Sequence, residues 1–139
     1  MSEIPTVDKT AIRDASTVIV LRDRATRPRV LMGQRGAKAA FMPNKFVFPG
    51  GAVDAADAAI PFASPLAPLC ARRLTDDAPP DCAPALAAAG IRELWEETGQ
   101  ILGQPGAWPG TPPEDWGAFA ARGLLPNAAP LQFVFRAIT

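Results

Sequence analysis

The chain contains no histidine, and only two of its 139 residues are cysteine. Without histidine, a Cys/His zinc site and a Ser-His-Asp catalytic triad are both excluded. Cys70 and Cys82 lie in one stretch rich in proline and alanine, and the polar N-terminus lacks the apolar core of a secretion signal. We therefore expect free thiols, with a Cys70–Cys82 disulfide as the less favoured alternative.

The sequence also lacks an excess of either charge and any long hydrophobic run. Fourteen basic and fourteen acidic residues give a net charge of zero, which argues against broad binding to nucleic acid or to a membrane surface. No run approaches the ~18 apolar residues that cross a bilayer. The absence of a secretion signal and of a membrane span predicts a cytoplasmic protein, and the length of 139 residues predicts one domain. Because histidine is absent, any metal would have oxygen ligands, which suit Mg²⁺ or Mn²⁺.

Apolar patterning predicts several elements. Residues 16–23 and 28–35 are expected to form an antiparallel hairpin, followed by a short strand at 45–48 that ends at Pro49-Gly50-Gly51. A helix is expected at 84–98, closed by Gly99 in the left-handed conformation, and a second at 114–123. Residues 131–139 are predicted to form a final strand.

Two features of this pattern concern the extent of the domain. Residues 58–91 hold eleven alanines and six prolines, a composition typical of an insertion or a mobile loop. We expect residues 58–80 to be mobile or to form a satellite outside the main sheet. A buried strand as the last element indicates a C-terminally truncated fragment, and the alternative is an edge strand that closes the sheet.

Three of the five glutamates in the chain lie within five positions of the predicted helix: Glu93, Glu96 and Glu97. At about 100° per residue, their carboxylates span only about 100° of the helix surface. They flank an expected core-facing stripe formed by Ala87, Ile91, Leu94 and Thr98. A solvated acidic face is one interpretation, whereas a bound divalent cation would turn the repulsion between these carboxylates into binding energy.

Residues 49–57 (PGGAVDAAD) and 92–99 (RELWEETG), read together, resemble the Nudix hydrolase signature G-x5-E-x7-R-E-U-x-E-E-x-G-U, where U is a bulky apolar residue. Gly51 matches the first glycine, and residues 92–99 match the second half at the correct spacing. The sequence departs from the signature in having Asp57 for the first glutamate, Gln100 after the last glycine, and about 27 extra residues in the spacer. A motif divided by a long insertion resembles that of the branch of Nudix proteins that includes peroxisomal coenzyme A diphosphatases.

The resemblance implies an α/β fold, a Nudix-type α/β/α sandwich with a mixed sheet, incomplete at the C-terminus. It implies a single Nudix domain over residues 1–139, with an insertion at 58–83. The implied activity is Mg²⁺- or Mn²⁺-dependent hydrolysis of a nucleoside diphosphate linked to another moiety, with coenzyme A or acyl-CoA as the leading substrate. The alternative is a regulatory Nudix domain that binds a nucleotide without catalysis.

The resemblance also assigns roles to individual residues. Glu96 and Glu97 would be the principal metal ligands, Glu93 would be a ligand or a proton acceptor, and the Gly51 carbonyl would complete the metal shell. Arg92 would orient the carboxylates, together with Asp57. Two cations outside the motif, Arg35 and Lys45, are candidates for a substrate phosphate, with a solvated surface cation as the alternative for each. The expected partner is a small nucleotide, with no nucleic acid and no membrane, and the oligomeric state is left open, a homodimer included.

Overall fold

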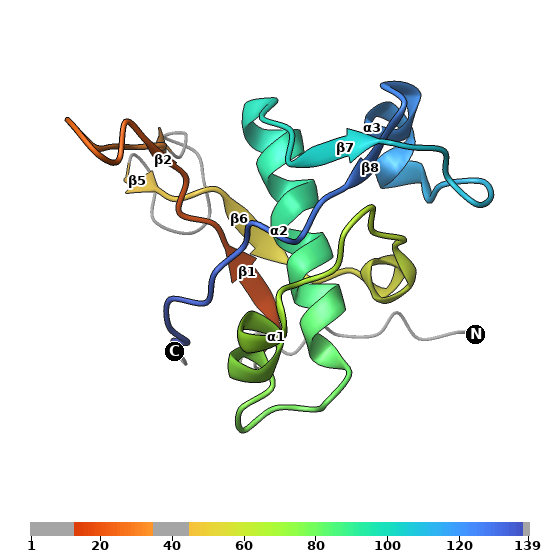
Figure 1. Ribbon diagram of the computed structural model, residues 1–139, viewed down its shortest axis with the longest axis horizontal. Coiled ribbons are helices and arrows are strands. Elements are labelled where there is room, and N and C mark those ends of the chain that lie inside the picture. Colours follow the sequence, from red (N-terminus) through yellow and green to blue (C-terminus); the bar gives the residue numbers. More distant parts are fainter. Residues whose placement is uncertain (1–12, 35–44, 138–139) are drawn as a thin grey trace, which may run out of the picture.

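The computed structural model describes residues 13–34 and 45–137. A central helix, α2 (Cys82–Thr98), runs through the molecule. Strands β1 (Ala15–Thr17) and β6 (Gly50–Ala52) lie along one side of α2, and β7 (Gly103–Pro105), β8 (Leu124–Pro126) and α3 (Gly117–Ala121) lie along another (Figure 1). Within the described residues, no helix is long and apolar enough to cross a membrane.

In the part of the chain that the structure describes, the strands form four antiparallel pairs. β1 pairs with β6, with Ser16 opposite Gly51, and β7 pairs with β8. The predicted hairpin is present, as β2 (Leu21–Arg22) against β3 (Arg29–Val30), while β4 (Gly33–Gln34) pairs with β5 (Phe46–Val47). A single parallel bridge joins Ser64 to Asn127. The predicted strands 16–23 and 28–35 are thus each divided into two short strands, and the two halves of each pair with different partners.

Helix α2 confirms the prediction for this segment. It begins two residues before the expected start and ends at Thr98, and Gly99 has a φ of 74°. Only glycine adopts this left-handed conformation without strain, which is why the helix stops there. In the expected stripe, Ala87, Ile91 and Leu94 are buried.

The attachment of α2 to the sheet depends on small side chains. The Ser16 hydroxyl of β1 donates a 2.6 Å hydrogen bond to the carbonyl of Leu86. A Cβ atom at Gly90 would lie 3.0 Å from Cγ2 of Val18. Glycine at position 90 therefore lets the helix approach the sheet closely enough for β1 and its neighbour β6 to reach the following turns of α2.

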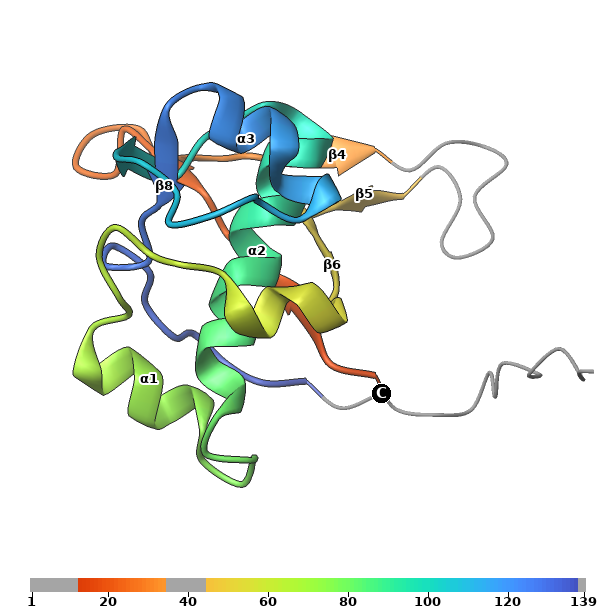
Figure 2. The same ribbon diagram turned by 90° about the vertical axis from the view of Figure 1, so that its right-hand side faces the viewer.

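The segment between the two halves of the motif is not a separate satellite, which corrects that part of the expectation for residues 58–80; the other part, a mobile segment, stays a prediction. It begins within the short helix η1 (Ala55–Ala59), which lies against α2 (Figure 2), and it contains α1 (Pro68–Leu74). Ile60 is 6% exposed and belongs to the main core, against which Phe62 and Leu66 also pack. The few large apolar side chains of this segment are thus sufficient to pack it against α2. Cys70 and Cys82 are both free thiols.

The helix predicted at 114–123 is present as a short η2 (Glu114–Trp116) followed directly by α3. These elements complete the core, because Trp116 and Phe119 are fully buried with their ring centroids 5.1 Å apart. Trp108 packs beside Trp116 at 5.9 Å. Trp95 meets Phe119 edge-on at 6.0 Å. The core therefore lies between α2 and the η2–α3 segment.

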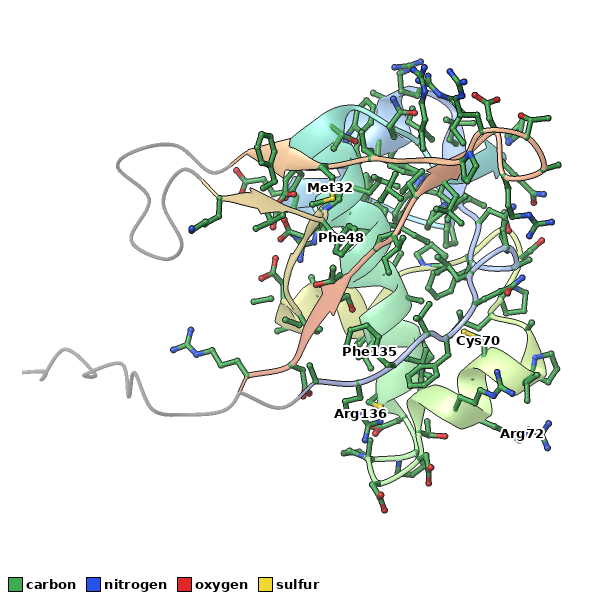
Figure 3. The ribbon with its side chains drawn as sticks, turned by 90° about the vertical axis from the view of Figure 1, so that its left-hand side faces the viewer. Met32, Phe48, Cys70, Arg72, Phe135 and Arg136 are labelled. Carbon is green, nitrogen blue, oxygen red and sulfur yellow. The ribbon has the colours of Figure 1, made fainter. Side chains whose placement is uncertain are left out.

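The strand predicted from residue 131 onward is wrong for the described part, because residues 131–137 form no strand. Alternating apolar side chains do not supply the neighbouring strand that a ladder of backbone hydrogen bonds requires. Arg136 instead donates hydrogen bonds to the carbonyls of Leu74 (2.8 Å) and Asp76 (2.6 Å), at the end of α1. Figure 3 shows Arg136 on this final segment and Cys70 and Arg72 on α1.

Candidate functional site

Arg92 is the centre of the candidate site. It lies in the second half of α2, and its side chain is 4% exposed. Its Nε atom donates to Asp57 Oδ1 at 3.1 Å and its Nη2 atom to Asp57 Oδ2 at 3.0 Å. Two parallel hydrogen bonds of this kind fix both position and orientation of the guanidinium. Asp57 is 1% exposed, so the pair is buried.

Asp57 reaches this position through η1. Its Oδ2 atom accepts a 2.8 Å hydrogen bond from the backbone N–H of Asp54, which holds the start of η1. One carboxylate thus satisfies a backbone donor and also binds the guanidinium of a residue 35 positions later. The shorter aspartate, where the signature has glutamate, is therefore long enough to reach Arg92 in this fold.

The other side of the guanidinium faces two glutamates. Nη1 of Arg92 donates to Glu93 Oε1 at 3.0 Å and to Glu96 Oε2 at 3.2 Å. Nη2 also donates to the carbonyl of Ala52 in β6 at 3.0 Å and lies 3.4 Å from an Asp54 carboxylate oxygen. Arg92 thereby ties together the loop before η1, strand β6 and the acidic flank of α2.

Burial by itself lowers the pKa of Arg92, because it disfavours the charged form. The hydrogen bonds and negative charge of Asp57, with the charges of Asp54 and Glu96, outweigh burial and raise the pKa. The guanidinium therefore remains charged at any pH at which the protein is folded.

Strand β6 brings its backbone directly against the glutamates. A Cβ atom at Gly51 would lie 2.5 Å from Cδ of Glu93, so only glycine leaves room for this carboxylate. The neighbouring N–H of Gly50 donates to Glu97 Oε2 at 3.3 Å. The two glycines therefore form the wall beside which Glu93 and Glu97 lie.

The glutamates differ in their electrostatic surroundings. Burial raises the pKa of Glu93. The positive charge of Arg92 lowers this pKa, and the adjacent Glu97 carboxylate raises it. Burial also raises the pKa of Glu96, with opposing effects from Arg92 and from Glu93 and Asp115. The net result is that both carboxyls hold their protons to a higher pH than free glutamate.

Asp115, in η2, is an acidic neighbour that sequence spacing does not place in the site. Its charge is close enough to raise the pKa of Glu96. The acid is 19 residues from Glu96 and carries no motif of its own, so only the packing of η2 against α2 brings it there. Asp54 is a second such acid.

These residues fit a divalent cation in the chemistry of their donors. Glu93, Glu96, Glu97 and the Gly51 carbonyl offer only oxygen atoms, the ligands that Mg²⁺ and Mn²⁺ prefer. The adjacent Glu93 and Glu97 carboxylates repel each other, and a cation between them would relieve that repulsion. Within residues 13–34 and 45–137, no three acidic or cysteine side chains are grouped as a metal cluster; Glu93 and Glu96 accept hydrogen bonds from Arg92.

The assignment of Arg35 and Lys45 to substrate binding stays a prediction. Arg35 falls outside the residues that the structure describes. Lys45 is exposed and directly precedes β5, with no ion pair among the described residues. The structure therefore brings together the motif residues Gly51, Arg92 and the three glutamates, and among the described residues no hydrogen bond or ion pair joins Lys45 to them.

Comparison with known proteins concerns the fold and the family of the chain. No protein-family model matches the chain. It is 39% identical over 90 residues to a protein described as putative nudix hydrolase 7 of Caenorhabditis elegans, a match that covers 65% of this chain and 22% of the relative. It also resembles the crystal structure of a NUDIX hydrolase from Alicyclobacillus acidocaldarius, with a TM-score of 0.64 and 30% identity, over 90% of this chain and 61% of that one.

The structural match shows a Nudix-type α/β fold, which confirms the predicted fold class. The sequence relative and the solved structure together support membership of the Nudix hydrolase family. The chain spans about a fifth of the length of the curated relative and about three fifths of the solved one.

Proposed function

We propose that the protein is a Mg²⁺- or Mn²⁺-dependent hydrolase of a nucleoside diphosphate linked to another moiety. The observation that carries this proposal is the Arg92 clamp, in which one buried guanidinium binds Asp57 on one side and Glu93 and Glu96 on the other. Such a clamp holds carboxylates at a fixed place on the helix, beside the backbone of Gly51. The two Nudix hydrolases that the chain resembles support the hydrolase part of this proposal.

Each residue of the clamp has a role in the proposed reaction. Arg92 is a positioning residue, since its donors are all directed at protein oxygens. Glu93 is the candidate proton acceptor, because burial raises its pKa and a base with a pKa nearer to neutrality is a more effective catalyst. Glu96, Glu97 and the Gly51 carbonyl are the candidate metal ligands. A bound Mg²⁺ or Mn²⁺ would neutralise the negative charge of the diphosphate at the reacting phosphorus.

Coenzyme A or an acyl-CoA is the substrate that we favour within this class. The reason is the motif itself, which is divided by a long segment as in the coenzyme A diphosphatase branch that the sequence resembles. The segment is built into the core through Ile60 rather than attached loosely, so the division is a feature of the fold. Arg35 and Lys45 remain the candidates for binding a substrate phosphate.

The decisive experiment compares turnover and metal binding in three proteins: the wild type, Glu97→Gln and the matched control Glu114→Gln. Glu114 is exposed and lies outside the clamp. Each protein is tested with coenzyme A, ADP-ribose and nucleotide sugars in the presence of Mg²⁺ or Mn²⁺. Calorimetric titration with the metal alone accompanies the assays.

We expect Glu97→Gln to lose metal-binding heat and at least about 100-fold in rate, since stabilising charge in the transition state contributes several kcal/mol and each ~1.4 kcal/mol is tenfold. Glu114→Gln should match the wild type. Equal heats in all three proteins would refute the metal-site assignment. Nucleotide binding without turnover by the wild type would favour the regulatory alternative.

A further inference from the structure

The β2–β3 hairpin carries a dense group of arginines. Between residues 22 and 29 there are four arginines and one acid, and every residue of this stretch is exposed. The hairpin lies at the edge of the molecule, away from α2 (Figure 1). Within the described part of the chain, all ion pairs belong to Arg92, so none of the four hairpin arginines, Arg22, Arg24, Arg27 and Arg29, has an acidic partner there.

Strand register makes this arrangement unfavourable for the isolated protein. Arg22 lies directly opposite Arg29 in the antiparallel pair. The Cβ atoms of two residues directly opposite each other lie about 4.5–5.5 Å apart, and like charges in such a pair are destabilising. An anion placed between the two guanidinium groups would convert this repulsion into attraction, and the fork of each guanidinium is suited to phosphate oxygens.

Charge is also unevenly divided along the chain. Residues 1–45 contain nine basic and four acidic residues, whereas residues 46–139 contain five and ten. The net charge of zero is therefore the sum of a part with charge +5 and a part with charge −5. An asymmetry of this kind is typical of chains that bind polyanions through one region. The acidic flank of α2 would repel the same polyanion, so among the described residues binding would be confined to the hairpin.

The two faces of the hairpin decide which polyanion fits. Leu21 pairs with Val30, and the next pair is Arg22 with Arg29. Because successive side chains in a strand point to opposite faces, the aliphatic pair and the arginine pair face different ways. The arginine pair has no apolar neighbour on its own face that could insert into a lipid interface, so it would bind an anionic membrane by charge alone. The rows of phosphates along a nucleic acid require only the arginines. Residues 21–30 contain no aromatic side chain for stacking on bases.

We infer that the β2–β3 hairpin binds the phosphate backbone of nucleic acid without reading its sequence. This inference is independent of the proposed hydrolase activity, since it uses no residue of the clamp. It departs from the expectation of no nucleic-acid partner, because that expectation rested on a net charge that averages over two parts of opposite sign.

The test is fluorescence anisotropy of a labelled DNA duplex of about 20 base pairs at several salt concentrations. Four phosphate contacts predict a slope of log K against log salt of about −3.6, or roughly 150-fold weaker binding between 50 and 200 mM salt. The double variants Arg22→Gln/Arg29→Gln and Arg24→Gln/Arg27→Gln should each reduce the slope to about −1.8, or roughly 12-fold over the same range.

The matched control is Arg72→Gln/Arg73→Gln, which removes the same charge from exposed positions on α1. Arg72 lies at the far end of the molecule from the hairpin (Figures 1 and 3). This control should keep the wild-type slope, and thermal melts should show that all variants fold. The inference is overturned if the control loses as much slope as the hairpin variants, or if the wild type does not bind the duplex at low salt. Stronger binding to phosphatidylserine vesicles than to the duplex would overturn it in favour of a membrane partner.

Discussion

Replacing Asp57 by asparagine should destabilise the protein substantially. The substitution keeps the size of the side chain and removes its charge, and its amide nitrogen would face a donor of Arg92. The variant therefore loses at least one of the 3.0 and 3.1 Å hydrogen bonds to the guanidinium. It also weakens the acceptor that receives the N–H of Asp54 at 2.8 Å.

The magnitude follows from burial. Asp57 is 1% exposed and Arg92 is 4% exposed, and removing one partner of a buried pair costs about 3–5 kcal/mol. Arg92 keeps its contacts with Glu93, Glu96 and the Ala52 carbonyl, which places the expected loss at the lower end, about 3 kcal/mol. For a chain of this length, that loss lowers the melting temperature by roughly 10 °C.

Urea unfolding followed by circular dichroism measures the free energy of unfolding directly. Asp54→Asn is the matched control, because Asp54 lies 3.4 Å from the same guanidinium but is 48% exposed. An exposed ion pair contributes at most about 1 kcal/mol. If Asp57→Asn and Asp54→Asn lose the same small amount, the clamp does not stabilise the fold in the way the geometry requires.

Two further substitutions test the surroundings of the clamp. Gly50→Ala should destabilise the protein by about 1–3 kcal/mol, because its Cβ would collide with the Ser16 carbonyl across the β1–β6 pair. The control Gly110→Ala should be close to neutral, since a Cβ atom there would have nothing within 4 Å. Equal melting temperatures of the two variants would contradict the register of the β1–β6 pair. Glu93→Gln should raise the melting temperature of the metal-free protein at neutral pH and lose this advantage in acid. The sign follows from the raised pKa of Glu93: the folded state binds more protons than the unfolded one just above the ordinary value of 4.5, so stability falls as the pH rises through that window. A gain that persists below this window would show that burial of the charge is not its cause.

Local signals account for the elements that the sequence predicts correctly. The end of α2 depends on Gly99, and its buried stripe depends on the spacing of Ala87, Ile91 and Leu94. The turn between Arg22 and Arg29 similarly depends on residues within the hairpin itself. Such features are predictable because periodicity and capping act within one or two turns of the chain. The same spacing placed Glu93, Glu96 and Glu97 on one flank of the helix.

Tertiary structure decided the features that depend on distant residues. The final segment has the alternation of a strand but forms none, because a strand also needs a neighbour with free backbone groups. Ile60 lies in a stretch of low complexity, yet it joins the core because η1 brings it against α2. Asp115 approaches Glu96 only through the packing of η2.

The sequence by itself determined the helix, its acidic flank and the family that the motif resembles. Only the tertiary structure decided how the two halves of the motif meet across the intervening segment. Asp57 and Arg92 are 35 residues apart, and no local signal states that their side chains will share two hydrogen bonds. The reason is physical: a buried charge is tolerated only when its partner is buried beside it, and burial is a property of the packed chain, not of either segment.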